Sequence, residues 1–141
     1  MEGNLKVVSE IQEDSILIAR LYENGVVEIE WNEKIEDIEV HHLQKMQEVV
    51  GEIGRGERMP LYYSTHEFLG ITKEARKFAV TKEGTKHTLI IAVLVNNLAM
   101  QLLFNFFMRV NRPKIPTKGF RNKEDAFQWL DKKGKKIQTI K

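Results

Sequence analysis

The segment from residue 86 to residue 130 constrains the fold of this chain more than any other. Leu89–Val95 is continuously apolar and rich in β-branched residues, a pattern typical of a central strand covered on both faces. The sequence then predicts a helix over Asn96–Val110, a short strand around Gly119–Arg121 and a final helix. Strands and helices in alternation indicate a compact α/β domain.

Three further strands are predicted upstream, at Val7–Ile11, Ile16–Tyr22 and Val26–Trp31. The last two flank the dipeptide Asn24-Gly25, which favours a hairpin because both residues tolerate positive φ. The three strands therefore precede the alternating part of the chain and are expected to join the same sheet.

The third of these strands alternates strictly between apolar and acidic residues. Val27, Ile29 and Trp31 fall on one face, and Glu28 and Glu30 fall on the other. Side chains point alternately to the two faces of a sheet, so the pattern predicts one buried face and one solvated face. On this interpretation the two glutamates belong to a wet surface and not to a cleft.

The remaining elements complete the order βββαβαβαβα. They are a helix from about Asp37 to Gly54, a strand at Met59–Ser64, a helix from a Thr72 cap to about Lys82, and a last helix from an Asn122 cap to Gly134. The connections are short enough for a single domain over residues 1–141. The first few residues and residues 134–141 are expected to be flexible.

Composition excludes several classes of function. The chain has 141 residues and no cysteine, so disulfides, thiol catalysis and cysteine-based metal sites are excluded. A net charge of +2 is too small to indicate a nucleic-acid partner. The N-terminus lacks the pattern of a signal peptide, and polar residues interrupt the apolar runs too soon for a membrane span. A soluble cytoplasmic protein is expected.

A set of short motifs between residues 72 and 131 resembles the STAS-like domain group. These motifs are Glu74-Ala75-Arg76, Ala92–Val95, Asn105–Phe107, Asn111–Pro113, Pro116–Lys118, Phe120, Glu124–Ala126 and Trp129-Leu130. The group includes bacterial anti-sigma-factor antagonists and, in outline, SEC14-type lipid-binding domains, and the motifs are most similar to an uncharacterised bacterial branch. The resemblance implies one mixed sheet of five to six strands with about four helices.

The same resemblance implies a small regulatory or protein-interaction module that is not an enzyme. The alternative is a carrier or sensor of a lipid or another small apolar ligand in the SEC14 manner. Signalling members of the group carry an Asp-Ser-Ser-Gly-like phosphorylation motif, which is absent from the corresponding segment 68–73. The resemblance therefore implies the fold and does not carry over the phosphorylation switch.

Thr72 is the regulatory candidate. A phosphate on its hydroxyl would meet the positive end of a helix together with Lys73 and Arg76. The favoured interpretation is structural, because threonine is a preferred helix cap whose hydroxyl binds the backbone.

The predicted helix at 96–110 is apolar over well over half of its circumference, more than packing on one sheet requires. We expect a homodimer interface first, since such dimers are common. An apolar ligand site is the second interpretation, and extra packing within the domain is the third. The candidate residues for interface or ligand site are Met100, Phe104, Phe107 and Met108.

Three cations near the end of this helix, Arg109, Arg112 and Lys114, form a small surface cluster. It is suited to an acidic partner or a lipid headgroup, although such clusters are more often simply solvated.

No catalytic, cofactor or metal site is predicted. His41 and His42 are adjacent in a helix and point about 100° apart, which does not suit one metal ion. Residues 64–67, Ser-Thr-His-Glu, contain a nucleophile and a base by type but read as turn and cap residues.

Overall fold

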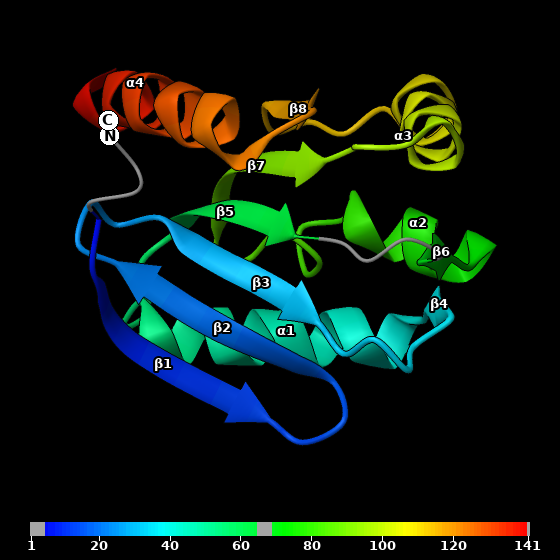
Figure 1. The fold of residues 1–141 in the computed structure, drawn as a ribbon, viewed down its shortest axis with the longest axis horizontal. Helices are drawn as coiled ribbons and strands as arrows, with labels where there is room; N and C mark the ends of the chain where they lie inside the picture. Colours follow the sequence, from blue (N-terminus) through cyan, green and yellow to red (C-terminus); the bar gives the residue numbers. More distant parts are fainter. Residues whose placement is uncertain (1–4, 65–68, 141) are drawn as a thin grey trace.

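The structure, a computed structural model, describes residues 5–64 and 69–140, with side chains as far as residue 136. A six-stranded mixed sheet forms its centre, in the order β1-β2-β3-β5-β7-β8 (Figure 1). Its strands are β1 (Val7–Glu13), β2 (Leu17–Tyr22), β3 (Val27–Trp31), β5 (Met59–Ser64), β7 (Thr88–Leu94) and β8 (Thr117–Phe120). The helices are α1 (Val40–Ile53), α2 (Lys73–Ala79), α3 (Leu98–Val110) and α4 (Lys123–Ile140).

The α/β class, the six-stranded sheet, the four helices and their order along the chain confirm the prediction from sequence. The pairs β1-β2 and β2-β3 are antiparallel, whereas β3-β5, β5-β7 and β7-β8 are parallel. The predicted hairpin joins β2 to β3. Only Gly25 takes a positive φ there, of 90°, and its N–H donates to the carbonyl of Tyr22 at 2.9 Å.

A second, two-stranded sheet was not predicted, and it moves the start of a helix. β4 (Asp37–Ile38) pairs in parallel with β6 (Gly70–Ile71), so residues expected in the first helical turn are extended instead. α1 consequently begins at Val40, after the N-cap residue Glu39, and the prediction of a start near Asp37 was wrong.

Two predicted helix ends were also wrong. α2 stops at Ala79 because the Thr81 hydroxyl donates to the carbonyl of Phe78 at 2.6 Å, which satisfies a terminal acceptor of the helix. α4 continues through Gly134 to Ile140. Gly134 is buried against Pro60 and Ile90, where a Cβ would already be in van der Waals contact with both side chains. A Cβ would fit there at an ordinary contact distance, so the packing does not require glycine, and the residue does not end the helix.

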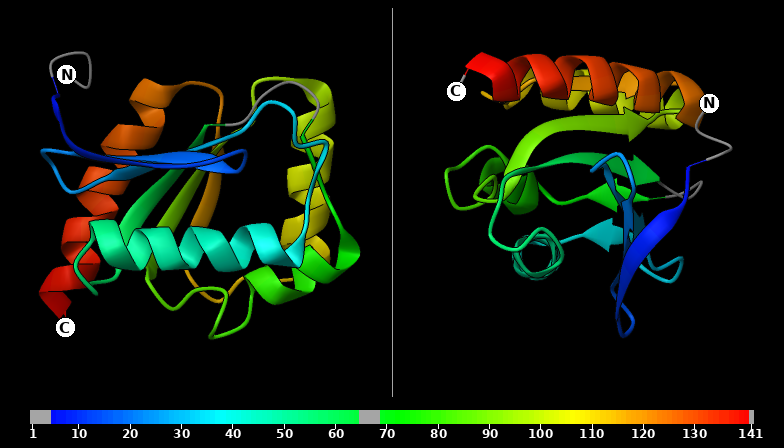
Figure 2. Two further views of the ribbon diagram at one scale, coloured as in Figure 1. Left: turned by 90° about the horizontal axis from the view of Figure 1, so that it is seen from below. Right: turned by 90° about the vertical axis from the view of Figure 1, so that its left-hand side faces the viewer.

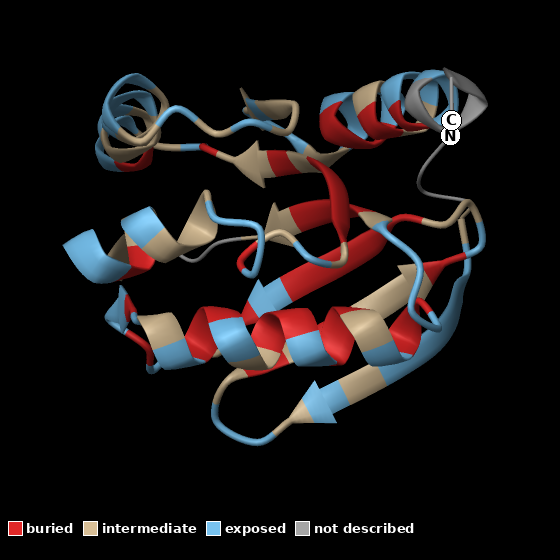
Figure 3. Ribbon diagram, turned by 180° about the vertical axis from the view of Figure 1, so that it is seen from behind, coloured by how far each residue is buried: buried red, intermediate tan, exposed pale blue. Residues whose placement is uncertain are grey.

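Two apolar layers lie on opposite faces of the sheet, under α1 on one side and under α4 on the other (Figure 2). Met46 and Val50 of α1 are buried in the first layer, and Phe127 and Leu130 of α4 are buried in the second. α3 differs from both helices. All of its residues are described, and Met100 is its single buried side chain; the rest of the helix is half-buried or exposed (Figure 3).

Within the described residues, no helix combines the length and the apolarity needed to cross a membrane.

Candidate functional site

A cavity of about 130 Å³ lies between α3 and the carboxyl ends of the parallel strands. Trp31 ends β3, Tyr63 lies near the end of β5 and Val93 near the end of β7, and all three line the cavity. Because parallel strands end at the same edge of a sheet, these side chains converge there. Open α/β sheets commonly bind ligands outside this edge.

α3 supplies one wall of the cavity. The Asn97 side chain accepts a hydrogen bond from the N–H of Met100 at 2.8 Å and so fixes the start of the helix. The inward-facing residues of α3 are Met100, Leu103, Phe104 and Phe107. Three of the four residues proposed from sequence as interface or ligand candidates thus lie at the cavity, whereas Met108 is half-buried and does not line it.

The rest of the wall comes from elements far apart in the sequence. α1 contributes Leu43 and Met46, the end of α2 contributes Ala79, and the segment between α3 and β8 contributes Pro113 and Ile115. Because this space forms only when several elements pack together, periodicity within any one of them did not reveal it.

The chemistry of the lining is apolar and uncharged. Among the described residues that line the cavity, none is Asp, Glu, Lys, Arg or His. The Thr117 hydroxyl already donates to the carbonyl of Ile115 at 3.0 Å. Desolvation raises the pKa of the Tyr63 hydroxyl well above its ordinary value of 10.0, so this group stays neutral. An ion entering the cavity would lose its hydration without gaining a charged partner.

Gly119 of β8 allows α3 to lie close to the sheet. A Cβ at this position would be 2.9 Å from a methyl carbon of Val95 and 3.2 Å from the ring of Phe104. Contacts this short would force either side chain to move, so the missing side chain holds the Phe104 ring at the cavity wall.

The opposite side of α3 carries a row of exposed apolar residues at four-residue spacing, which we call the outer ridge. It consists of Leu98, Leu102, Phe106 and Val110, which are 69%, 61%, 38% and 53% exposed. The excess apolar circumference seen in the sequence is therefore divided between two surfaces. One side of α3 faces the cavity, and the other is open to solvent.

The predicted cationic cluster lies at the carboxyl end of the same helix. Arg109, Arg112 and Lys114 are all exposed, and Arg112 has a positive φ of 50°. Arg76 of α2 extends the cluster, because its guanidinium carbon lies 5.0 Å from the centroid of the Phe106 ring. This neighbour is more than thirty positions away in sequence from the predicted cluster and was not foreseen.

Thr72 caps α2, as the structural interpretation expects. Its hydroxyl oxygen accepts a hydrogen bond from the N–H of Ala75 at 3.1 Å. The Arg76 guanidinium, which a phosphate on Thr72 would meet, donates to the carbonyl of Ile71 at 3.1 Å.

A buried polar cluster on the α4 side of the sheet overturns one prediction. Glu28 was expected on a solvated face, yet it is 7% exposed because α4 covers it. The Tyr22 hydroxyl donates to Glu28 at 2.6 Å, and the ammonium of Lys123 lies 2.7 Å from the Tyr22 hydroxyl and 3.3 Å from Glu28. Burial, followed by the hydrogen bond to Glu28, raises the pKa of Tyr22. The cluster joins β2, β3 and α4, which is a structural role.

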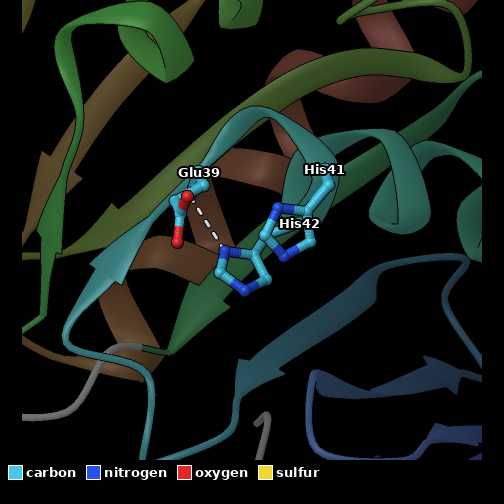
Figure 4. A group of neighbouring side chains, drawn as sticks. All are labelled: Glu39, His41 and His42. Carbon is cyan, nitrogen blue, oxygen red and sulfur yellow. Dashed lines mark hydrogen bonds between the residues drawn. The ribbon is translucent and has the colours of Figure 1, made fainter.

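Glu39, His41 and His42 bring three metal-binding groups within 4.8 Å of one another (Figure 4). The two imidazoles were expected to diverge, but their ring centroids are 4.0 Å apart. His42 Nδ1 accepts a hydrogen bond from the N–H of Glu39 at 2.9 Å. Burial, with a smaller effect of His41, lowers the pKa of His42, so its ring is neutral at pH 7.

That hydrogen bond decides the role of His42. A neutral imidazole that accepts at Nδ1 carries its proton on Nε2, so neither ring nitrogen can bind a metal while the hydrogen bond persists. A metal ion would have to displace the contact that caps α1. We therefore assign His42 to the cap of the helix and not to a metal centre.

The residues considered for catalysis are not assembled into a site. The Ser64 hydroxyl, at the end of β5, donates to the carbonyl of Ile29 at 3.5 Å. Thr65, His66 and Glu67 lie outside the described residues.

Comparison with known proteins places the chain in a family. One similar solved structure is that of a protein with unknown function from Arthrobacter sp. FB24, which is 21% identical in sequence. The match covers 86% of this chain and 96% of the Arthrobacter chain, with a TM-score of 0.31. No match was found among curated proteins. Residues 21–133 match the family model described as a domain of unknown function (DUF7793), and the chain belongs to this family.

Proposed function

We propose that the protein is a non-enzymatic binding module of STAS-like type that holds a small apolar molecule in the cavity beneath α3. The cavity carries this proposal: it lies at the carboxyl edge of the parallel strands and has an uncharged lining. The STAS-like assignment is supported by the order of elements and by the motifs between residues 72 and 131.

The size of the cavity limits the ligand. An apolar cavity of about 150 Å³ in another protein is sufficient for benzene or xenon. The volume of about 130 Å³ found here suits one ring or a short branched hydrocarbon group. A complete lipid is larger than this volume, so the SEC14-like carrier suggested by the sequence would have to widen the cavity or leave part of the lipid in solvent.

Binding is favoured because it completes the packing of the wall. Side chains that face a void lack partners for dispersion contacts, and a bound apolar molecule supplies these contacts. The bound molecule also removes its own apolar surface from water. α3 has the most to gain, since Met100 is its single buried side chain among thirteen described residues.

The test compares two alanine-to-phenylalanine substitutions in helices. Ala79→Phe places a ring into the cavity from α2, whereas Ala99→Phe places the same ring on the exposed side of α3. We expect benzene to raise the melting temperature of the unmodified protein and of Ala99→Phe, but not of Ala79→Phe. Equal responses of all three proteins to benzene, or no response of the unmodified protein, would contradict the proposal.

The protein-interaction role suggested by the sequence has support from a separate observation, the outer ridge. A homodimer through α3 would have to use this ridge, because Met100, Phe104 and Phe107 face the cavity. Light scattering on the purified chain measures directly whether such a dimer forms.

A further inference from the structure

We propose that the outer ridge of α3 binds an acidic amphipathic helix of a partner protein. The proposal concerns the solvent side of α3 and is independent of the cavity on its inner side. It rests on the shape of the ridge and on the charge around it.

The ridge has the dimensions of a helix-packing surface. Its four residues are spaced i, i+4, i+8 and i+12 and extend over roughly 18 Å of helix. Rows of this spacing fit into the grooves of a second helix. A parallel row of polar residues, Gln101, Asn105 and Arg109, borders the ridge.

The narrowness of the ridge favours a helix over a membrane surface. A helix that lies in a bilayer interface buries a broad apolar face, with its polar residues on the far side. The large exposed apolar residues of α3 form a single row, and Asn105 and Arg109 lie on the same outward side as Leu102. Burial in lipid would strip water from these polar groups, whereas a partner helix can bind them at the rim.

The charge of the surrounding segment specifies an acidic partner. Residues 96–118 contain four Lys or Arg and no Asp or Glu, although the whole chain has a net charge of only +2. Arg76, Arg109, Arg112 and Lys114, beside the ridge or beyond its carboxyl end, form no ion pair with any described residue. Carboxylates beside the apolar residues of a partner helix would complement these cations.

The same charge argues against a second copy of this chain. A symmetric pair joined through the ridge would place two acid-free, cationic segments against each other, and like charges at an interface oppose association.

The experiment uses the full chain and two synthetic helical peptides. Both carry leucines at i, i+4, i+8 and i+12; glutamates flank these leucines in one peptide and lysines in the other. Fluorescence anisotropy measures the affinity of each peptide at low and high salt. We expect the glutamate peptide to bind, added salt to weaken its binding, and the lysine peptide to bind at least about tenfold more weakly.

A pair of identical substitutions locates the binding surface. Val110 in the ridge and Val8 on the edge strand β1 are 53% and 59% exposed, so Val110→Glu and Val8→Glu change surfaces of similar accessibility. Val110→Glu should weaken binding of the glutamate peptide by about tenfold or more, and Val8→Glu by less than about twofold. Leu102→Glu, at the centre of the ridge, provides a second variant with an equal or larger loss. Circular dichroism confirms that each variant is folded.

Four results would overturn the proposal. They are equal binding of the two peptides, equal effects of Val110→Glu and Val8→Glu, co-sedimentation with phosphatidylserine vesicles without peptide binding, and a dimer that Val110→Glu dissociates. The response of melting temperature to benzene, measured on Val110→Glu, separates this proposal from the cavity, because Val110 does not line it.

Discussion

The hydroxyl of Tyr22 donates a hydrogen bond of 2.6 Å to the carboxylate of Glu28, in the layer between the sheet and α4. The two residues lie on neighbouring strands, and Lys123 at the start of α4 completes the cluster. A carboxylate in this position is stable because a hydroxyl and an ammonium group replace the water that it loses. The cluster therefore fixes where α4 begins on the sheet.

Removing the Glu28 carboxylate should destabilise the fold more than removing an exposed one. We expect Glu28→Ala to lower the free energy of unfolding by about 2–3 kcal/mol, because it removes a charged acceptor from a buried cluster. Glu28→Gln keeps an acceptor for Tyr22 and should cost about 1 kcal/mol. Urea denaturation measures both changes.

Glu30→Ala on the same strand provides the control. Glu30 is exposed and pairs with Arg20 at 2.7 Å, so its loss should cost no more than about 1 kcal/mol. If Glu28→Ala were no more destabilising than Glu30→Ala, the structural role of the buried cluster would be refuted.

The cap of α1 should make stability depend on pH through His42. Its pKa is lowered in the folded chain from the ordinary 6.5, because burial and His41 disfavour the charged ring. Just below pH 6.5 the unfolded state therefore binds more protons than the folded state. The contribution of the neutral His42 ring to the free energy of unfolding is fully present above pH 6.5. It is lost as the pH falls through the lower pKa of His42 in the folded chain.

His42→Gln separates the cap from the titration. Glutamine is a usual residue at this third helical position, where its side chain reaches back to the N–H of the cap residue. The variant should unfold with a similar free energy at about pH 7.5, while the decline between about pH 6.5 and pH 5 becomes shallower. His41→Gln should keep most of that decline. An unchanged pH profile for His42→Gln would show that His42 contributes nothing to it.

The ring of His87 occupies the space that a side chain on Gly51 would need. This contact should reverse the usual effect of replacing a helical glycine by alanine. A Cβ on Gly51 would lie 2.6 Å from Nε2 of His87. Alanine in place of glycine within a helix usually stabilises by up to about 1 kcal/mol. Here we expect Gly51→Ala to destabilise by about 1–2 kcal/mol, because the ring has to move.

In a His87→Ala background, Gly51→Ala has no ring to displace. It should then stabilise, by up to about 1 kcal/mol, as measured by denaturation of the single and double variants. The same sign in both backgrounds would contradict the contact between α1 and the segment before β7.

The features that sequence predicted correctly are those set by local patterns. Apolar alternation in β3, the continuous apolar run of β7 and the helical spacing of α1 each depend on neighbouring residues, and each element is present. The caps at Thr72 and Asn122 were also predicted correctly, because side chains of these types bind N–H groups three positions ahead; Asn122 accepts from the N–H of Asp125 at 2.8 Å.

The features that it missed depend on distant segments. Glu28 occupies a position whose sequence pattern predicts exposure to solvent. It is buried only because α4, some ninety-five positions later in the chain, packs over it. The pair β4-β6 consists of two residues on each strand, too short for any periodicity. α3 is apolar on both sides, so its own spacing does not distinguish the face toward the cavity from the face toward solvent. Gly134 resembles a helix terminator, yet α4 continues through it to Ile140.

The cavity beneath α3 is tested most directly by methionine methyl resonances during titration with benzene. Met46 and Met100 line the cavity, whereas Met59 and Met108 do not and serve as internal controls. With ¹³C-labelled methionine, we predict that benzene shifts the Met46 and Met100 methyl signals in a saturable manner and leaves those of Met59 and Met108 in place. Equal shifts of the Met46, Met59, Met100 and Met108 methyl signals, or no saturable shift at Met46 and Met100, would contradict binding in this cavity.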